Sequence, residues 1–177
     1  MKILIACEFS GIVRDAFAAR GHDAWSCDLL PTERQGQHIQ GDVLGILNDK
    51  WDMMIAHPPC TYLCSSGLHW NNRTPGRDEL TKQALDFVFK LLNAPINKIA
   101  LENPVGRINT AYRKPSQSIH PWQFGHDASK KTCLWLKKLP ILKHTKIIPP
   151  RGYKTVKFAD EMSLCPNCEE EAFCEEH

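Results

Sequence analysis

Cys60 is the residue of this chain best placed to act as a nucleophile. It follows Pro58 and Pro59, directly after an apolar segment that predicts a β-strand. Because proline fixes the backbone, a thiol on such a turn is held rigidly at the end of the strand, where it can react. The alternative is a buried cysteine that packs as a small hydrophobic residue, the commoner fate of a single cysteine. The two prolines, with Thr61 and the Ser65-Ser66-Gly67 segment behind them, favour the nucleophile.

Two acidic residues stand at the ends of other predicted strands. Glu102 closes an apolar segment and precedes Asn103 and Pro104. At the same sheet edge as Cys60, its carboxylate could hydrogen-bond a substrate ring and protonate it, although taken alone a surface glutamate that caps a loop is the more ordinary interpretation. Asp28 ends another strand, where an acid suits the two ribose hydroxyls of a nucleoside cofactor. Aspartate is also common in turns, so that interpretation stays open as well.

The turn after the first predicted strand narrows the choice of cofactor. Ser10 and Gly11 leave the backbone room to approach a ligand, but the G-x-G-x-x-G pattern of dinucleotide binding is missing, which disfavours NAD and FAD. The G-x-x-x-x-G-K-[ST] pattern is missing too, which excludes a P-loop nucleotidase.

Alternating strands and helices must position these residues. The sequence predicts strands over 2–7, 23–28, 51–56 and 98–101, a helix after Gly11 and another over 78–92. This alternation predicts an α/β fold, a Rossmann-like, mainly parallel, doubly wound sheet whose ligands bind beyond the carboxyl ends of the strands. We expect one or two long ordered loops over 103–130, and two further strands over 132–136 and 145–148.

Taken together, the motifs resemble those of the DNA cytosine-C5 methyltransferases in order and spacing over roughly residues 1–136. The matching positions are Phe9-Ser10-Gly11, Asp28, Gly41-Asp42-Val43, Pro58-Pro59-Cys60, and Glu102-Asn103-Pro104 where the family has Glu-Asn-Val. The resemblance implies an S-adenosylmethionine-dependent methyltransferase in which the Cys60 thiolate adds to C6 of a cytosine while Glu102 holds N3 and the exocyclic amine. It implies a cofactor pocket built from Phe9, Ser10, Gly11, Asp28, Asp42 and Pro58, and substrate contacts from Asn103, Lys131 and Thr132.

The chain departs from this family in several places, among them the lack of the family's late Gly-Asn-Ser motif. Val13 and Arg14 stand where further glycines are usual, and Lys130 and Lys131 stand near the family's arginine-rich motif. No segment is long enough for a separate target-recognition domain, so the chain resembles the short methylase-like proteins of phages and prophages. We expect DNA as the substrate, single-stranded or with little sequence preference. Free cytosine nucleotides, recognition supplied by a partner, and a non-catalytic nucleic-acid-binding or regulatory module on the same fold remain alternatives.

Cysteine and histidine also cluster near the carboxyl terminus. Cys165 and Cys168 form a C-x-x-C pair, and Cys174 and His177 complete four ligands, so we expect a structural zinc site in a small Cys-rich segment over 151–177, after a catalytic domain over 1–150. A disordered tail is the alternative, and a thiol redox pair ranks last because it does not follow the first strand of a βαβ unit. His57, His120 and His126 are each more typical of loop histidines than of ligands or bases.

Composition sets the remaining bounds. The chain of 177 residues suits one main domain, with 42% hydrophobic and 24% charged residues, and no apolar run approaches a membrane span. Glu8 interrupts the first apolar segment, so we expect no signal peptide, and eight cysteines then indicate a reducing, cytoplasmic setting. A net charge of +2 permits a nucleic-acid partner without requiring one.

Overall fold

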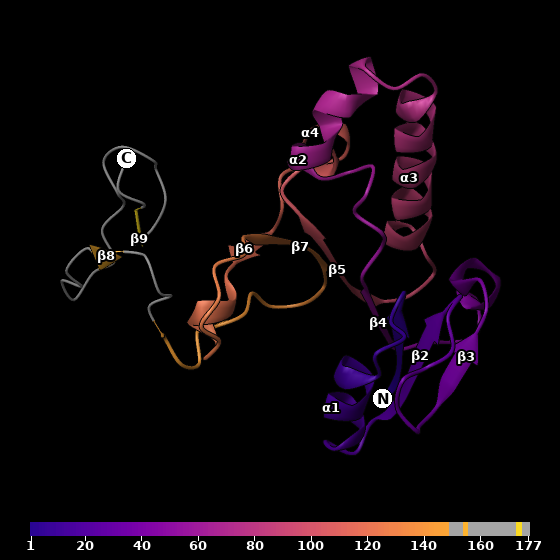
Figure 1. The fold of residues 1–177 in the computed structure, drawn as a ribbon. Helices are drawn as coiled ribbons and strands as arrows, with labels where there is room; N and C mark the ends of the chain where they lie inside the picture. The colour runs from indigo at the N-terminus through magenta and orange to yellow at the C-terminus, as the bar shows by residue number, and fades with distance from the viewer. Residues whose placement is uncertain (149–153, 156–172, 175–177) are drawn as a thin grey trace. The chain divides into compact units, whose positions relative to one another are not determined.

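The structure is a computed structural model that describes residues 1–148, 154–155 and 173–174 (Figure 1). The chain divides into two compact units. The first consists of Met1–Ser118 with Thr132–Leu142, and the second consists of Ile119–Lys131 with the chain from Lys143 onward. The predicted domain boundary at residue 150 lies outside the described residues and stays a prediction.

A seven-stranded sheet in the order β3-β2-β1-β4-β5-β7-β6 forms the main structure. Its strands are β1 (Lys2–Ala6), β2 (Asp23–Asp28), β3 (His38–Gln40), β4 (Met53–Ala56), β5 (Lys98–Pro104), β6 (Gln117–Ile119) and β7 (Thr132–Lys137). The strands from β3 to β5 pair in parallel, and β7 pairs antiparallel with β5. The expected α/β architecture with a mainly parallel sheet is therefore confirmed. Its first five strands follow the Rossmann order, in which the direction of winding switches between β1 and β4.

Helices on both faces make the sheet doubly wound. The helical segments are α1 (Ile12–Ala18), η1 (Val43–Ile46), α2 (Ser65–Leu68), η2 (His69–Asn72), α3 (Arg77–Leu92), α4 (Ile108–Ala111) and η3 (Pro121–Gln123). Successive residues of a strand point to opposite faces. On β1, Ile3 packs in a cluster with Phe17 of α1, whereas Leu4 packs in a second cluster with Val88 and Leu91 of α3. The two helices thus cover opposite faces of the central strands.

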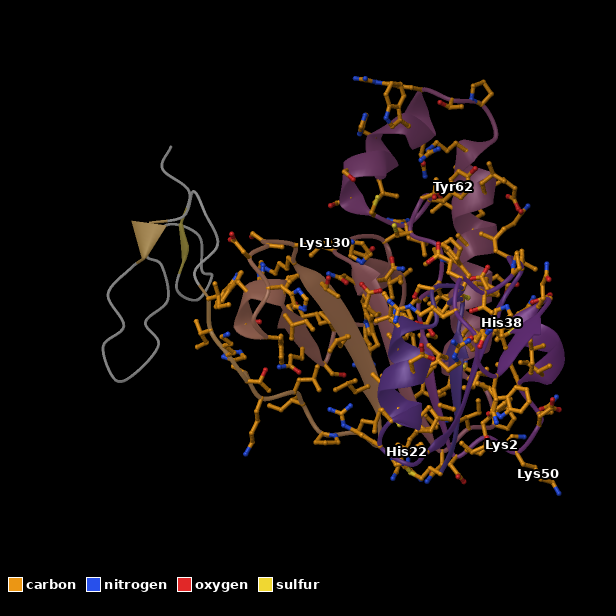
Figure 2. All side chains as sticks on the ribbon, turned by 60° about the horizontal axis from the view of Figure 1, so that its bottom comes forward. Lys2, His22, His38, Lys50, Tyr62 and Lys130 are labelled. Carbon is orange, nitrogen blue, oxygen red and sulfur yellow. The ribbon has the colours of Figure 1, made fainter. Side chains whose placement is uncertain are left out.

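The two ends of the sheet carry different residues. Figure 2 shows Lys2, His22 and Lys50 at the end where the strands begin, and Tyr62 at the end where they finish. Lys2 Nζ donates a hydrogen bond to the Asp49 carbonyl at 3.0 Å, which ties the start of β1 to the chain before β4. Asp28, the last residue of β2, lies instead at the carboxyl end. In the described part of the chain, no helix has the length and apolar character needed to cross a bilayer.

Several predicted boundaries change. The third predicted strand begins at Met53 rather than Trp51, and β5 runs beyond Leu101 to Pro104. The region 103–130, expected as long loops, contains α4, β6 and η3. The predicted strand over 145–148 is wrong, since only Lys146 forms an isolated bridge, with Phe124 of the same unit. Two short strands, β8 (Lys154–Thr155) and β9 (Phe173–Cys174), pair antiparallel.

Candidate functional site

Four neighbouring strands deliver one polar or ionisable residue each to the carboxyl edge of the sheet. The parallel register aligns Cys27 of β2, Ala6 of β1, Ala56 of β4 and Leu101 of β5. The residues that follow them directly in the chain are Asp28, Cys7, His57 and Glu102. The His57 amide donates to the Ala6 carbonyl at 2.9 Å, so the pattern continues one residue past β4. The edge therefore runs from Asp28, a predicted cofactor residue, to Glu102, a predicted catalytic residue.

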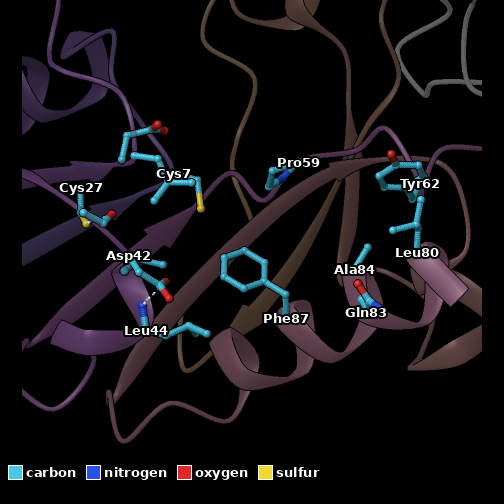
Figure 3. Close-up of a pocket in the computed structure, with 14 residues that line it drawn as sticks. Cys7, Cys27, Asp42, Leu44, Pro59, Tyr62, Leu80, Gln83, Ala84 and Phe87 are labelled. Atoms are coloured by element: carbon cyan, nitrogen blue, oxygen red, sulfur yellow. Dashed lines mark hydrogen bonds between the residues drawn. The ribbon is translucent and has the colours of Figure 1, made fainter.

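A cavity of about 470 Å³ opens at the Asp28 end of this edge (Figure 3). Its walls come from the ends of β1 and β2, the segment before η1, the turn after β4, and α3. The lining residues are Cys7, Cys27, Asp28, Leu29, Gly41, Asp42, Val43, Leu44, Pro59, Tyr62, Leu80, Gln83, Ala84 and Phe87. The cavity combines a largely apolar wall with two carboxylates, an arrangement typical of small-molecule sites.

Asp28 and Asp42, which the sequence predicts as cofactor residues, both line this cavity, and each has one carboxylate oxygen fixed by the backbone. Oδ1 of Asp28 accepts from the Leu30 amide at 3.0 Å, and Oδ1 of Asp42 accepts from the Leu44 amide at 2.9 Å (Figure 3). Oδ2 of each residue makes no hydrogen bond within the described part of the chain. Two oriented carboxylates can therefore accept hydrogen bonds from hydroxyl or amino groups of a ligand.

The apolar side of α3 serves two purposes. The sequence places Leu80, Ala84, Phe87, Val88 and Leu91 on one side of the predicted helix, as a core-facing stripe would require. Val88 and Leu91 are fully buried in the core, whereas Leu80, Ala84 and Phe87 line the cavity. The helical pattern predicted the stripe but not its division between core and ligand site.

Two thiols beside the carboxylates are held neutral. Burial, reinforced by the negative charge of Asp28, raises the pKa of Cys7 to about 12 and that of Cys27 to about 11. The thiol form therefore dominates at neutral pH, although Cys7 stands at a strand end in a left-handed conformation with φ 59°. Neither thiol is suited to nucleophilic attack.

The start of α1 is capped by an internal carboxylate. Glu8, which is 6% exposed, accepts from the Val13 amide at 2.7 Å, from the Arg14 amide at 3.3 Å and from Ser10 Oγ at 3.1 Å. In dinucleotide-binding folds, the backbone amides at the start of this helix bind the pyrophosphate instead. The predicted residues Phe9 and Ser10 line a second, smaller cavity together with Cys7, Glu8, Ile12, Val13 and His57. A negative charge at this helix start suits a cationic ligand group better than an anionic one.

Arg14, one of the departures from the family motif, is a buried structural residue. Its guanidinium, 1% exposed, donates to Ser26 Oγ and Thr32 Oγ1 and to the carbonyls of Arg34 and Gln35, all within 3.2 Å. A Cβ atom added at Gly11 or Gly36 would lie 2.5 or 2.7 Å from this side chain. Gly11 therefore serves the packing of Arg14, which fastens α1 to the connection between β2 and β3.

The turn that carries Cys60 is fixed from two sides. Asn103, 1% exposed on β5, donates from Nδ2 to the Pro58 carbonyl at 2.8 Å. The Cys60 carbonyl accepts from the amides of Leu63 and Cys64, both at 2.9 Å, so the chain closes a helical turn behind it. The Cys60 side chain is partly buried and forms no disulfide within the described residues. Pro58 is buried, and the neighbouring Pro59, not Pro58, contributes to the cavity wall.

Glu102 lies beside a residue that sequence reasoning treated as an ordinary loop histidine. His57 Nδ1 lies 3.2 Å from Glu102 Oε2, and the two side chains are 30% and 27% exposed. The Pro58–Asn103 contact one step further continues the same alignment of β4 with β5. His57 directly follows β4, and β4 pairs with β5, which carries Glu102. The sequence could identify His57 as a site residue only if this pairing were known.

The structure says less about the other predicted substrate and zinc residues. Thr132 begins β7 and pairs with Pro104. Lys131 belongs to the second unit, so its contact with substrate stays a prediction. The predicted zinc ligands Cys165, Cys168 and His177 lie outside the described residues, and Cys174 is described only as part of β9. Within the described ranges, no group of three or more histidine, cysteine, aspartate or glutamate residues could hold a metal ion.

A scan of the sequence against models of protein families finds no matching family, and a search of curated proteins finds no match.

Proposed function

We propose that the protein is an S-adenosylmethionine-dependent cytosine-C5 methyltransferase that acts on DNA through Cys60. One observation carries the proposal: Asn103 of β5 holds the Pro58 carbonyl at 2.8 Å. This bond joins the proline-cysteine turn and the Glu102-Asn103 pair, two motifs far apart in the chain, at one edge of a parallel sheet. The edge also opens on a cavity of about 470 Å³ with two carboxylates.

The cavity suits the proposed cofactor. Asp28 would accept hydrogen bonds from ribose hydroxyls, and Asp42 would accept one from the adenine, as the family resemblance implies. Leu44 and Phe87 would supply apolar surface for the ring. Glu8 places a negative charge near a ligand with a cationic sulfonium and ammonium group. When bound, S-adenosylmethionine would supply an electrophilic methyl group.

The chain's own residues would activate the cytosine. The Cys60 thiolate adds to C6, and Glu102 donates a proton to N3 as negative charge develops on the ring, which makes C5 nucleophilic. After methylation C5 loses its proton, the C6–S bond breaks, and Cys60 leaves as a thiolate. Asn103 keeps the turn in register with Glu102, and a misplacement of about 1 Å at such a site can cost roughly a hundredfold in rate.

The direct test follows a labelled methyl group from S-adenosylmethionine to duplex DNA, single-stranded DNA and free cytosine nucleotides. We expect label at cytosine C5 with the parent protein and none with Cys60→Ser, which should still bind the cofactor. The acceptor that is labelled decides between DNA and free nucleotides.

DNA that contains 5-fluorocytosine provides a second measurement. Fluorine cannot leave as a cation, so the Cys60–C6 bond should persist and the protein should migrate with the DNA in a denaturing gel. Activity in Cys60→Ser would refute the nucleophile, and absence of both labelling and cofactor binding in the parent would favour the non-catalytic module.

A further inference from the structure

The contact between His57 and Glu102 has no counterpart among the family motifs recognised in the sequence. The His57 Nδ1 and Glu102 Oε2 atoms are 3.2 Å apart, within the range of a hydrogen-bonded ion pair. The second ring nitrogen, Nε2, is buried and has no hydrogen-bond partner within the described residues. A ring nitrogen that is shielded from solvent without a partner is unusual for a loop histidine.

The surroundings of the pair are defined by the strands on either side. Cys7 and Glu8, which follow β1, line the same small cavity as His57. Glu102 of β5 contacts the imidazole at 3.2 Å, and Cys60 lies three residues further along the same turn. Glu8 is engaged with the start of α1, and the Cys7 thiol stays neutral because burial raises its pKa to about 12. Glu102 is thus the acid that contacts the imidazole directly.

We propose that His57 is a positioning residue that holds Glu102 and shares the proton that Glu102 delivers to the cytosine ring. This inference rests on the proposed function. The pair carries one exchangeable proton, either as imidazolium with carboxylate or as imidazole with carboxylic acid. When the Cys60 thiolate bonds to C6, that proton passes to N3 and leaves neutral imidazole and carboxylate. When the C6–S bond breaks, the N3 proton returns to the pair, while the C5 proton is lost to solvent.

The arrangement addresses a specific chemical difficulty. An isolated glutamate is ionised at neutral pH and has no proton to give, whereas histidine changes charge between about pH 5 and pH 8. With Nδ1 bound to Oε2, the other carboxylate oxygen is left for the substrate. Activity should therefore decline as rising pH removes the proton of the pair.

His57→Asn is the informative variant, because the asparagine amide can still donate to Glu102 but cannot carry the proton. Its pH–rate profile should have its optimum at lower pH than the parent, with kcat about tenfold or more lower at pH 7.5 and KM for DNA little changed. His22→Asn, at the opposite end of the sheet, is the matched control and should reproduce the parent profile. If His57→Asn lowers kcat by the same factor at every pH, the proton-sharing role is overturned.

A measurement without substrate separates this inference from the proposed function. In NMR of the full chain labelled with nitrogen-15, the His57 Nδ1 signal should report a ring nitrogen hydrogen-bonded to Glu102, and it should shift in Glu102→Ala. An unchanged Nδ1 signal in Glu102→Ala would overturn the inference even if the protein methylates DNA. Conversely, a parent protein that methylates nothing would refute the proposed function, whereas the contact between Nδ1 and Glu102 would still be seen in this spectrum.

Discussion

At the residue scale, two cysteines that both follow strands of the sheet differ in their surroundings. Cys7 and Cys60 both follow parallel strands of the sheet, β1 and β4. Cys7 is kept protonated by burial and by the charge of Asp28, whereas Cys60 stands on a turn that two prolines and Asn103 hold in place. A nearby neutral thiol adds polarisable surface to the cavity without competing as a nucleophile.

Keeping the Cys7 and Cys27 thiols protonated should lower the free energy of unfolding at alkaline pH. Between pH 9 and 11 an unfolded thiol with a pKa near 9.0 loses its proton, while folded Cys7 and Cys27, with pKa values of about 12 and 11, keep theirs. The unfolded state then binds fewer protons, so the free energy of unfolding should fall by up to about 1.4 kcal/mol per pH unit for each thiol. Urea unfolding at pH 9, 10 and 11 under reducing conditions measures this slope. Cys7→Ser should roughly halve it, and a parent protein with no slope would contradict the prediction.

The residues that sequence could and could not identify differ in a physical way. Asp28 and Asp42 were predicted as cofactor residues, because Asp28 ends an apolar strand and Asp42 resembles a family motif, and the structure places both in the wall of one cavity. Cys7 and His57 were not singled out as site residues, since their importance depends on which strands are neighbours. That information is held by the pairing of β1 with β4 and of β4 with β5, which local patterns do not encode.

At the element scale, a close approach of two backbones fixes the turn that carries the proposed nucleophile. The Ser65 amide donates to the Val105 carbonyl at 2.9 Å, and the Arg107 amide donates to the Leu63 carbonyl at 2.7 Å. Gly106 lies between these bonds. A Cβ atom there would overlap with the Leu63 carbonyl oxygen and would lie 2.8 Å from Cys64 Cα, both backbone atoms.

Gly106→Ala should therefore move the turn after Cys60 while leaving the sheet intact. We expect methyl transfer to fall roughly a hundredfold, the effect of a displacement of about 1 Å at a reacting group, with cofactor affinity changed little. Gly45→Ala is the matched control, because a Cβ there meets no atom within 4 Å. Transfer assays beside calorimetric cofactor titrations make the comparison. Full activity in Gly106→Ala would show that the turn does not need this approach.

The elements themselves were largely predictable, with one instructive failure. The periodicity of α3 and the apolar segments of β1 and β2 predicted those elements within about a residue, because burial of a face dominates their sequence. The segment 145–148 has the β-branched composition of a strand but forms only one bridge, at Lys146. β-branched residues favour a strand mainly because they pack against a neighbouring strand. Composition alone therefore does not predict a strand where no neighbouring strand is available.

At the scale of the whole molecule, the carboxyl-terminal segment provides a separate prediction. Cys165, Cys168, Cys174 and His177 have the spacing of a compact zinc site. Protein purified without chelator should carry about one zinc per chain by elemental analysis, and Cys165→Ser with Cys168→Ser should carry none. Metal-free parent protein after gentle purification would remove the zinc proposal and leave the methyl-transfer chemistry untouched, since the latter uses residues of the first unit.

Ligand binding to the first unit should stabilise that unit against unfolding. A cofactor present at about a hundredfold over its dissociation constant adds roughly 2.7 kcal/mol to the free energy of unfolding, which corresponds to an increase in Tm of about 5–10 °C for a protein of this size. S-adenosylmethionine and its demethylated product should both produce this increase, and NAD should not. Asp28→Asn keeps the size of the side chain while removing its charge, so it should reduce the increase without lowering the Tm of the free protein. Equal stabilisation of Asp28→Asn and parent would place the cofactor elsewhere, whereas no increase in the parent would mean that the cavity binds a different ligand.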